Sequence, residues 1–176
     1  MLRKRLLILS LALVGLAGCN QHPAVPTQPK EKAVAPGEIG SRVPYFSVKD
    51  LQGREVSSAD LRGKVVLIDF WATWCKPCKQ EMPGYQKLVD LYGSRGFAVV
   101  GLKFNDMPDT EDPILFAKKL GVRYPLAVAP DDLRQKFGGI EGLPTTMLFD
   151  RKGILRYKVI GFEYTDAVEA KLKPLL

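Results

Sequence analysis

An apolar run that leads into a pair of closely spaced cysteines constrains this chain most strongly. Residues 65–71 read Val-Val-Leu-Ile-Asp-Phe-Trp, and residues 74–78 read Trp-Cys-Lys-Pro-Cys. The first run is rich in β-branched residues and predicts a central strand that is covered on both faces. Apolar residues at helical spacing predict a helix over Gln80–Tyr92. Cys75 and Cys78 therefore lie at an expected strand-to-helix junction.

Thiols at the start of a helix are chemically activated. The N-terminus of a helix carries about half a positive charge and several unpaired N–H groups, which lower the pKa of a thiol. Lys76 adds a second positive charge. We expect Cys75 to be the more exposed, attacking thiolate and Cys78, one turn further in, to resolve the mixed disulfide. The alternative is a zinc half-site, which needs two further ligands, but the single histidine of the chain, His22, is far from this segment. The sequence predicts no metal site.

The N-terminal residues have the pattern of an export signal. Residues 3–5 are basic, residues 6–14 are apolar except for one serine, and residues 16–19 read Leu-Ala-Gly-Cys. The apolar stretch is too short to span a bilayer, so residues 1–18 are predicted to be a signal peptide. The ending resembles the lipobox of bacterial lipoproteins, which implies cleavage before Cys19 and lipid attachment to its thiol. The alternative is an ordinary signal peptide with a coincidental cysteine.

Composition divides the rest of the chain into two parts. Residues 19–40 are rich in proline and poor in large apolar residues, which predicts a disordered spacer. Residues 41–176 have the length of one domain with one core. The formal net charge of +7 falls to +4 when the three basic residues of the signal peptide are removed. This charge is too small and too dispersed to indicate nucleic-acid binding.

The coarse pattern of the domain alternates strands with helices. It predicts a hairpin over residues 45–57, strands over 97–104, 126–129, 145–149 and 154–160, and helices over 112–120, 131–137 and 166–172. Such an order predicts an α/β fold in which helices cover both faces of a mixed sheet.

Two segments resemble the signatures of thioredoxin-like proteins. Residues 69–78 look like their active-site segment, and Gly-Leu-Pro-Thr at residues 142–145 resembles their cis-proline loop, which faces the CxxC. The lipobox, the N-terminal hairpin and an insertion at residues 104–120 make the chain most similar to the membrane-tethered TlpA/ResA branch. The resemblance covers residues 41–176. It implies a thioredoxin fold, a central mixed β-sheet flanked by helices, with an N-terminal β-hairpin extension and an insertion.

Two acidic residues stand near the cysteines. Asp69 interrupts the apolar strand at the position of the buried aspartate of thioredoxins; burial would raise its pKa and let it take the proton of Cys78. Glu81 follows Cys78 by three residues, near the same helix face, where ResA-like proteins carry a functional glutamate. The alternatives are an aspartate that reaches solvent from a strand end and a solvated helix glutamate. The division of roles between the two acids stays open.

Three further residues are expected to contact substrate. A cis Pro144 would leave the backbone of Leu143 free to pair with an extended substrate segment. Trp74 would shield the disulfide or contact the substrate. A simple turn proline and a plain core aromatic residue are the alternatives.

The resemblance implies a lipid-anchored thiol–disulfide oxidoreductase without a cofactor, on the extracytoplasmic (periplasmic) side of a bacterial cell envelope. Its partners would be disulfide-containing protein substrates, for example apocytochrome c in cytochrome c biogenesis, and an integral-membrane thiol electron donor. An oxidising or isomerising exchanger remains an alternative. A copper-binding module of the same fold is another, although such modules typically use CxxxC with a distant histidine. A peroxiredoxin-like peroxidase is disfavoured, because Ala72 stands where threonine or serine is needed.

Overall fold

The computed structural model describes residues 34–176. The expected signal peptide, the lipid-attachment residue Cys19 and spacer residues 19–33 lie outside the described residues. Residues 34–40, which the composition assigns to the spacer, form turns that pack on the domain: a side chain at Gly37 would collide with the main-chain oxygen of Phe137. The packed region thus begins before Ser41. Within residues 34–176, no helix is both long and apolar enough to cross a membrane.

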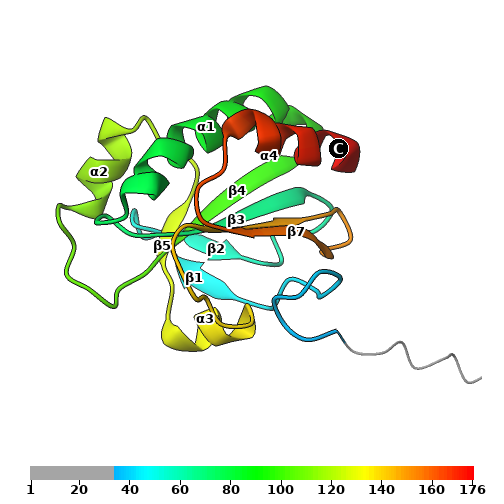
Figure 1. The fold of residues 1–176 in the computed structure, drawn as a ribbon, viewed down its shortest axis with the longest axis horizontal. Coiled ribbons are helices and arrows are strands. Elements are labelled where there is room, and N and C mark those ends of the chain that lie inside the picture. Colours follow the sequence, from blue (N-terminus) through cyan, green and yellow to red (C-terminus); the bar gives the residue numbers. More distant parts are fainter. Residues whose placement is uncertain (1–33) are drawn as a thin grey trace, which may run out of the picture. The chain divides into compact units, whose positions relative to one another are not determined.

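A five-stranded mixed sheet forms the centre of the domain, with strand order β5-β4-β3-β6-β7 (Figure 1). The central strand β3 is parallel to β4 and antiparallel to β6. All seven residues of β3 are buried, as expected for a strand covered on both faces. The strand bounds are β3 Val65–Trp71, β4 Phe97–Lys103, β5 Leu126–Val128, β6 Thr145–Phe149 and β7 Leu155–Ile160.

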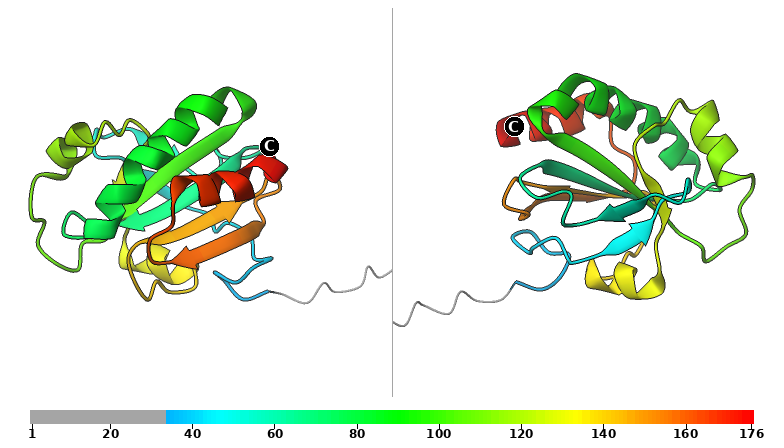
Figure 2. Two further views of the ribbon diagram at one scale, coloured as in Figure 1. Left: turned by 45° about the horizontal axis from the view of Figure 1, so that its top comes forward. Right: turned by 180° about the vertical axis from the view of Figure 1, so that it is seen from behind.

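Helices cover both faces of this sheet. Helices α1 and α4 lie side by side on one face, and α3 lies on the other (Figures 1 and 2). A separate antiparallel hairpin of β1 and β2 precedes β3 and is joined to β5 by a bridge between Asp50 and Ala127. The remaining bounds are β1 Ser47–Lys49, β2 Glu55–Ser57, α1 Lys76–Tyr92, α2 Pro113–Lys119, α3 Asp131–Lys136 and α4 Thr165–Leu172, with short 3₁₀ turns at Gly93–Arg95 and Lys173–Leu175. The expected α/β fold is confirmed.

The first helix begins earlier than its apolar spacing predicts. Cys75 is the N-cap residue of α1 and its sulfur accepts a hydrogen bond from the N–H of Cys78, while Pro77 occupies the first turn. Proline is favoured there because the missing N–H has no partner within the helix. The helix also continues through Pro83. The cap and the proline therefore start α1 at Lys76, before Gln80.

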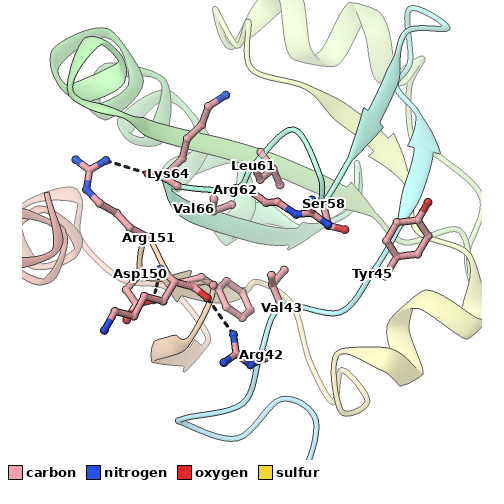
Figure 3. Close-up of a pocket in the computed structure, with 14 residues that line it drawn as sticks. Arg42, Val43, Tyr45, Ser58, Leu61, Arg62, Lys64, Val66, Asp150 and Arg151 are labelled. Atoms are coloured by element: carbon pink, nitrogen blue, oxygen red, sulfur yellow. Dashed lines mark hydrogen bonds between the residues drawn. The ribbon is translucent and has the colours of Figure 1, made fainter.

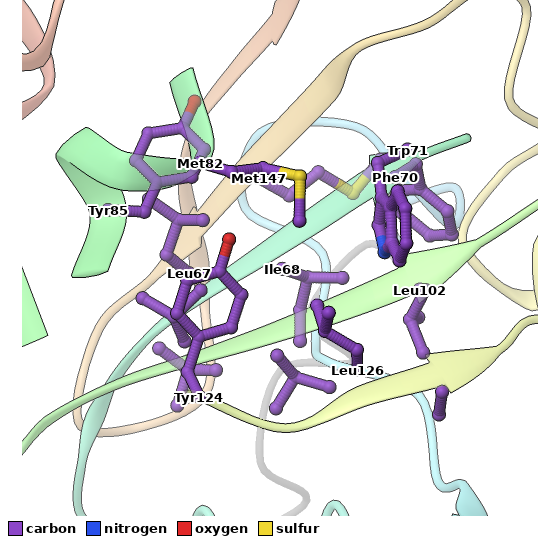
Figure 4. Close-up of a cluster of buried hydrophobic side chains, with 14 of the residues drawn as sticks. Leu67, Ile68, Phe70, Trp71, Met82, Tyr85, Leu102, Tyr124, Leu126 and Met147 are labelled. Carbon is purple, nitrogen blue, oxygen red and sulfur yellow. The ribbon is translucent and has the colours of Figure 1, made fainter. Parts of the chain in front are cut away.

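The core fixes the position of the cysteines. Leu67 and Ile68 of β3 lie with Met82 of α1 and Met147 of β6 in one buried cluster (Figure 4). Since α1 follows β3 directly in the chain and packs against the neighbouring strand β4, the start of α1 is held at the carboxyl end of β3 in the middle of the sheet. The CxxC segment is placed there.

Candidate active site

Cys75 and Cys78 form a disulfide at the junction of β3 and α1. Cys75 is only 3% exposed and Cys78 is fully buried. Cys75 is the more exposed of the two cysteines, as expected, although its side chain packs into the core cluster beside the helix start. The N–H of Cys78 lies 3.3 Å from the sulfur of Cys75. A negative charge that develops on this sulfur would therefore face a main-chain donor and the positive end of α1.

Asp69 lies in the middle of β3, where it is fully buried. It stands opposite Gly101 of β4 and Thr146 of β6. Neither carboxyl oxygen has a hydrogen-bond partner among residues 34–176. Burial, with a smaller effect of the neighbouring Glu81, raises the pKa of Asp69 well above its usual range. The expected burial is confirmed, and a solvated aspartate at the strand end is excluded.

Glu81 is 1% exposed on α1. One carboxyl oxygen accepts a hydrogen bond from the main-chain N–H of Glu163 at 2.5 Å, and the other has no partner among the described residues. Burial raises the pKa of Glu81 from 4.5 to about 7, although the hydrogen bond from the N–H of Glu163 opposes this shift. A solvated helix glutamate is thereby excluded. A carboxyl group with this pKa can gain or lose a proton near neutral pH.

Two tyrosines complete a buried polar cluster around these acids. The hydroxyl of Tyr85, one helical turn after Glu81, lies 2.9 Å from Thr146 Oγ1. The hydroxyl of Tyr124 has no partner among residues 34–176. Burial is the first cause that raises both tyrosine pKa values, and the charges of Asp69 and Glu81 add to it. We call Asp69, Glu81, Tyr85 and Tyr124 the acidic cluster. Its tyrosines were not singled out from the sequence, although the spacing from Glu81 to Tyr85 places both on one helix face.

The predicted substrate-contact residues lie at the same end of the sheet. The Leu143–Pro144 peptide bond is cis. Pro144 is buried directly before β6, whose first residue pairs with Phe70 near the end of β3. Leu143 and Trp74 are half-buried and pack against the core. The structure therefore brings these residues to the sheet end that carries the disulfide.

A second cluster of polar side chains joins the active-site loop to the part of the insertion that precedes α2. Lys103, at the end of β4, is 1% exposed and donates to both carboxyl oxygens of Asp109 at 2.8 and 2.9 Å. The hydroxyl of Thr73 donates to Asp109 at 2.9 Å and accepts the N–H of Thr110 at 3.0 Å. The insertion is thus fastened to the loop that carries Cys75. The sequence showed Lys103 only as part of a buried strand, because its partner lies in a loop of irregular conformation.

The hollow at the opposite end of the sheet is not part of this site. It has a volume of about 260 Å³, lies at the start of β3, and is rimmed by Arg42, Lys64 and Arg151 (Figure 3). The guanidinium of Arg151 donates to main-chain oxygens of Gly63 and Arg95. The charged ends of the labelled basic residues point apart rather than toward a common point. Among residues 34–176, no group of three or more His, Cys, Asp or Glu side chains is arranged to hold a metal ion.

Comparison with known proteins identifies the family of this chain. The model of the AhpC/TSA family matches residues 39–158. The chain belongs to this thioredoxin-like family. It is 35% identical over 142 residues to the thiol-disulfide oxidoreductase ResA of Bacillus thuringiensis (strain Al Hakam), covering 78% of this chain and 79% of that protein. It is 34% identical over 166 residues to the thioredoxin-like protein YneN of Bacillus subtilis (strain 168), covering 94% of each.

Solved structures in the same family share the fold. A thiol:disulfide interchange protein from Chlorobium tepidum TLS has a TM-score of 0.70 and 31% identity, covering 77% of this chain and 96% of that chain. The expected thioredoxin fold is confirmed. The protein is a thiol–disulfide oxidoreductase of the type that these relatives represent.

Proposed function

We propose that this protein reduces disulfides in partner proteins by exchange at Cys75 and Cys78. The observation that carries the proposal is the Cys75–Cys78 disulfide at the start of α1, on the same helix as a buried carboxyl group whose pKa is about 7. The helix start favours a thiolate at Cys75, and the acidic cluster offers a proton acceptor for Cys78.

The exchange proceeds in two balanced steps. The Cys75 thiolate attacks one sulfur of a substrate disulfide, so a bond to Cys75 forms as the substrate S–S bond breaks, and the released sulfur takes a proton from water. Cys78 then gives its proton to a carboxylate of the acidic cluster, Glu81 or Asp69. Its thiolate attacks the sulfur of Cys75, and the second substrate sulfur leaves. Two electrons pass to the substrate, and the Cys75–Cys78 disulfide is formed.

Substrate recognition would involve residues at the same end of the sheet. The main chain of Leu143, beside Pro144, is proposed to pair with an extended segment of the substrate, and Trp74 is proposed to cover the exchanging sulfurs. Main-chain hydrogen bonds depend little on the side chains of the substrate. We therefore propose that the enzyme accepts proteins of varied sequence, provided that their disulfide is accessible. Apocytochrome c, whose haem-binding cysteines must be reduced, is our proposed example.

The cell envelope is the proposed location. The basic and apolar residues 3–14 and the Leu-Ala-Gly-Cys ending at Cys19 support export, lipid attachment and a domain on the extracytoplasmic side. In such an oxidising compartment the pair must be reduced again after each turnover. We propose an integral-membrane thiol carrier as that electron donor.

A redox titration of Cys75 and Cys78 in glutathione buffers tests this function. A two-electron transition near the potential of thioredoxin, about −270 mV, is expected for a reductant, whereas a potential near that of DsbA, about −120 mV, would contradict the reducing direction. Insulin reduction, measured with Cys75→Ser beside the unchanged protein, tests the exchange itself. Activity that survives in Cys75→Ser would show that another group does the chemistry.

A further inference from the structure

A cluster behind Glu81 ties together the loop after β7 and helix α4. The Tyr157 hydroxyl donates to both carboxyl oxygens of Glu163 at 2.9 Å, and the Lys171 ammonium donates to one of them at 2.6 Å. The ammonium also lies 4.3 Å from the centre of the Tyr157 ring. We call Tyr157, Glu163 and Lys171 the Glu163 cluster. The Glu163 side chain is only 15% exposed, so its charge needs these partners.

The same residue contacts Glu81 through its main chain. The N–H of Glu163 donates to a carboxyl oxygen of Glu81 at 2.5 Å. Among the described residues, it is the main-chain group that forms a hydrogen bond with Glu81. The loop is also held at its start, where the N–H of Gly161 donates to the main-chain oxygen of Pro144 at 2.8 Å. Because the side chain of Glu163 is fixed by β7 and α4, its N–H is fixed as well.

We propose that Glu163 is a positioning residue that, held by Tyr157 and Lys171, aims its main-chain N–H at Glu81 and thereby orients this carboxyl group for proton exchange with Cys78. The inference rests on the proposed role of Glu81. The new element is that residues of β7 and α4, outside the CxxC segment, control the orientation and the pKa of Glu81.

The charges around Glu81 determine in which direction its pKa should move when Glu163 or Lys171 is replaced. The acid faces Asp69 of β3, Tyr85 of α1, Tyr124 before β5 and Glu163, and Lys171 stands behind Glu163. The N–H of Glu163 lowers the pKa of Glu81, whereas the negative charge of its side chain raises it. Lys171 neutralises that charge. Removing the charge of Glu163 and removing the charge of Lys171 must therefore move the pKa of Glu81 in opposite directions.

The experiment is a ¹³C NMR titration of glutamate side-chain carboxyl groups in the full, oxidised protein, with the Glu81 signal assigned by its loss in Glu81→Gln. Glu163→Gln keeps the main-chain N–H and removes the repelling charge, so the pKa of Glu81 should fall by roughly 0.5–1 pH unit. Lys171→Met leaves the charge of Glu163 uncompensated and its side chain held by Tyr157 alone, so the pKa of Glu81 should rise by a similar amount. Glu163→Gln is nearly isosteric and keeps the experiment decisive should Lys171→Met fail to fold.

Lys173→Met is the matched control. It removes the same charge just beyond α4, where Lys173 pairs with Glu169 at 2.9 Å. It should leave the titration of Glu81 unchanged. Equal shifts in Lys171→Met and Lys173→Met, or shifts of the same sign in Glu163→Gln and Lys171→Met, would overturn the proposal. The role of Glu81 is tested separately: if Glu81→Gln resolves mixed disulfides at the unchanged rate, the proposed proton acceptor is wrong whatever the titration shows.

Discussion

Replacing Glu81 by glutamine should change how the stability of the protein depends on pH. Folding raises the pKa of this carboxyl group from 4.5 to about 7, so the folded protein binds the proton more tightly than the unfolded chain. The difference corresponds to about 3 kcal/mol, at about 1.4 kcal/mol for each tenfold change in proton affinity. The stabilisation from this protonation is complete below pH 4.5 and is lost as the pH rises through about 7. Asp69 acts with the same sign, because burial also raises its pKa.

Urea unfolding of the oxidised protein at pH 5, 6, 7, 8 and 9 measures the effect. The unchanged protein should lose stability relative to Glu81→Gln as the pH rises, by about 3 kcal/mol between pH 5 and 9. Glutamine keeps an oxygen that can accept from the N–H of Glu163, so the comparison isolates the charge. Glu141→Gln, at an exposed position, is the control and should show no such trend. If the difference in unfolding free energy between Glu81→Gln and the unchanged protein is the same at every pH, then Glu81 is not a buried group that titrates in this range.

Four further substitutions test the site and the packing around it. Asp109→Ala leaves Lys103 buried without its ion pair and should cost about 3 kcal/mol in urea unfolding, whereas Lys103→Met should cost less because the side chain of Asp109 is 28% exposed and stays hydrated; equal losses would contradict this. Gly84→Ala should cost about 1–3 kcal/mol, since the new methyl group meets the Thr165 hydroxyl at the start of α4; an unchanged unfolding midpoint would show that α4 shifts freely. Asp69→Asn should slow the decay of a mixed disulfide at Cys75 in quenched-flow measurements, and an unaltered rate would assign the proton transfer to Glu81 alone.

Local signals were sufficient for the cysteine pair and for Asp69. An apolar strand, a helix start and two thiols follow one another within a short segment. A charged residue inside an otherwise apolar strand indicated burial of Asp69, and the structure then excluded the alternative of a strand end that reaches solvent. The burial of Glu81 could not be predicted in the same way. The N–H that satisfies its carboxyl group comes from Glu163, 82 residues later in the chain, so only the packing of α1 against the last loop decides it.

The misjudged features also depend on contacts between distant segments. Cys75 is more exposed than Cys78, as predicted, but the sequence did not predict that the whole junction packs into the core. Residues 34–40 look like a spacer by composition, yet Gly37 and Gly138 let two main-chain segments approach closely. The partner of Lys103 is Asp109, which lies in an irregular loop that has no periodic sequence pattern from which its conformation could be predicted.

Trapping the covalent intermediate tests the central claim most directly. Reduced protein that carries Cys78→Ser cannot resolve an exchange, so incubation with a peptide that contains a disulfide should yield a stable mixed disulfide, located at Cys75 by peptide mass mapping. Cys75→Ser should yield none in the same time. If Cys78→Ser gives no adduct, or if Cys75→Ser forms one at Cys78 just as fast, then Cys75 is not the attacking thiol and the mechanism proposed for this site is wrong.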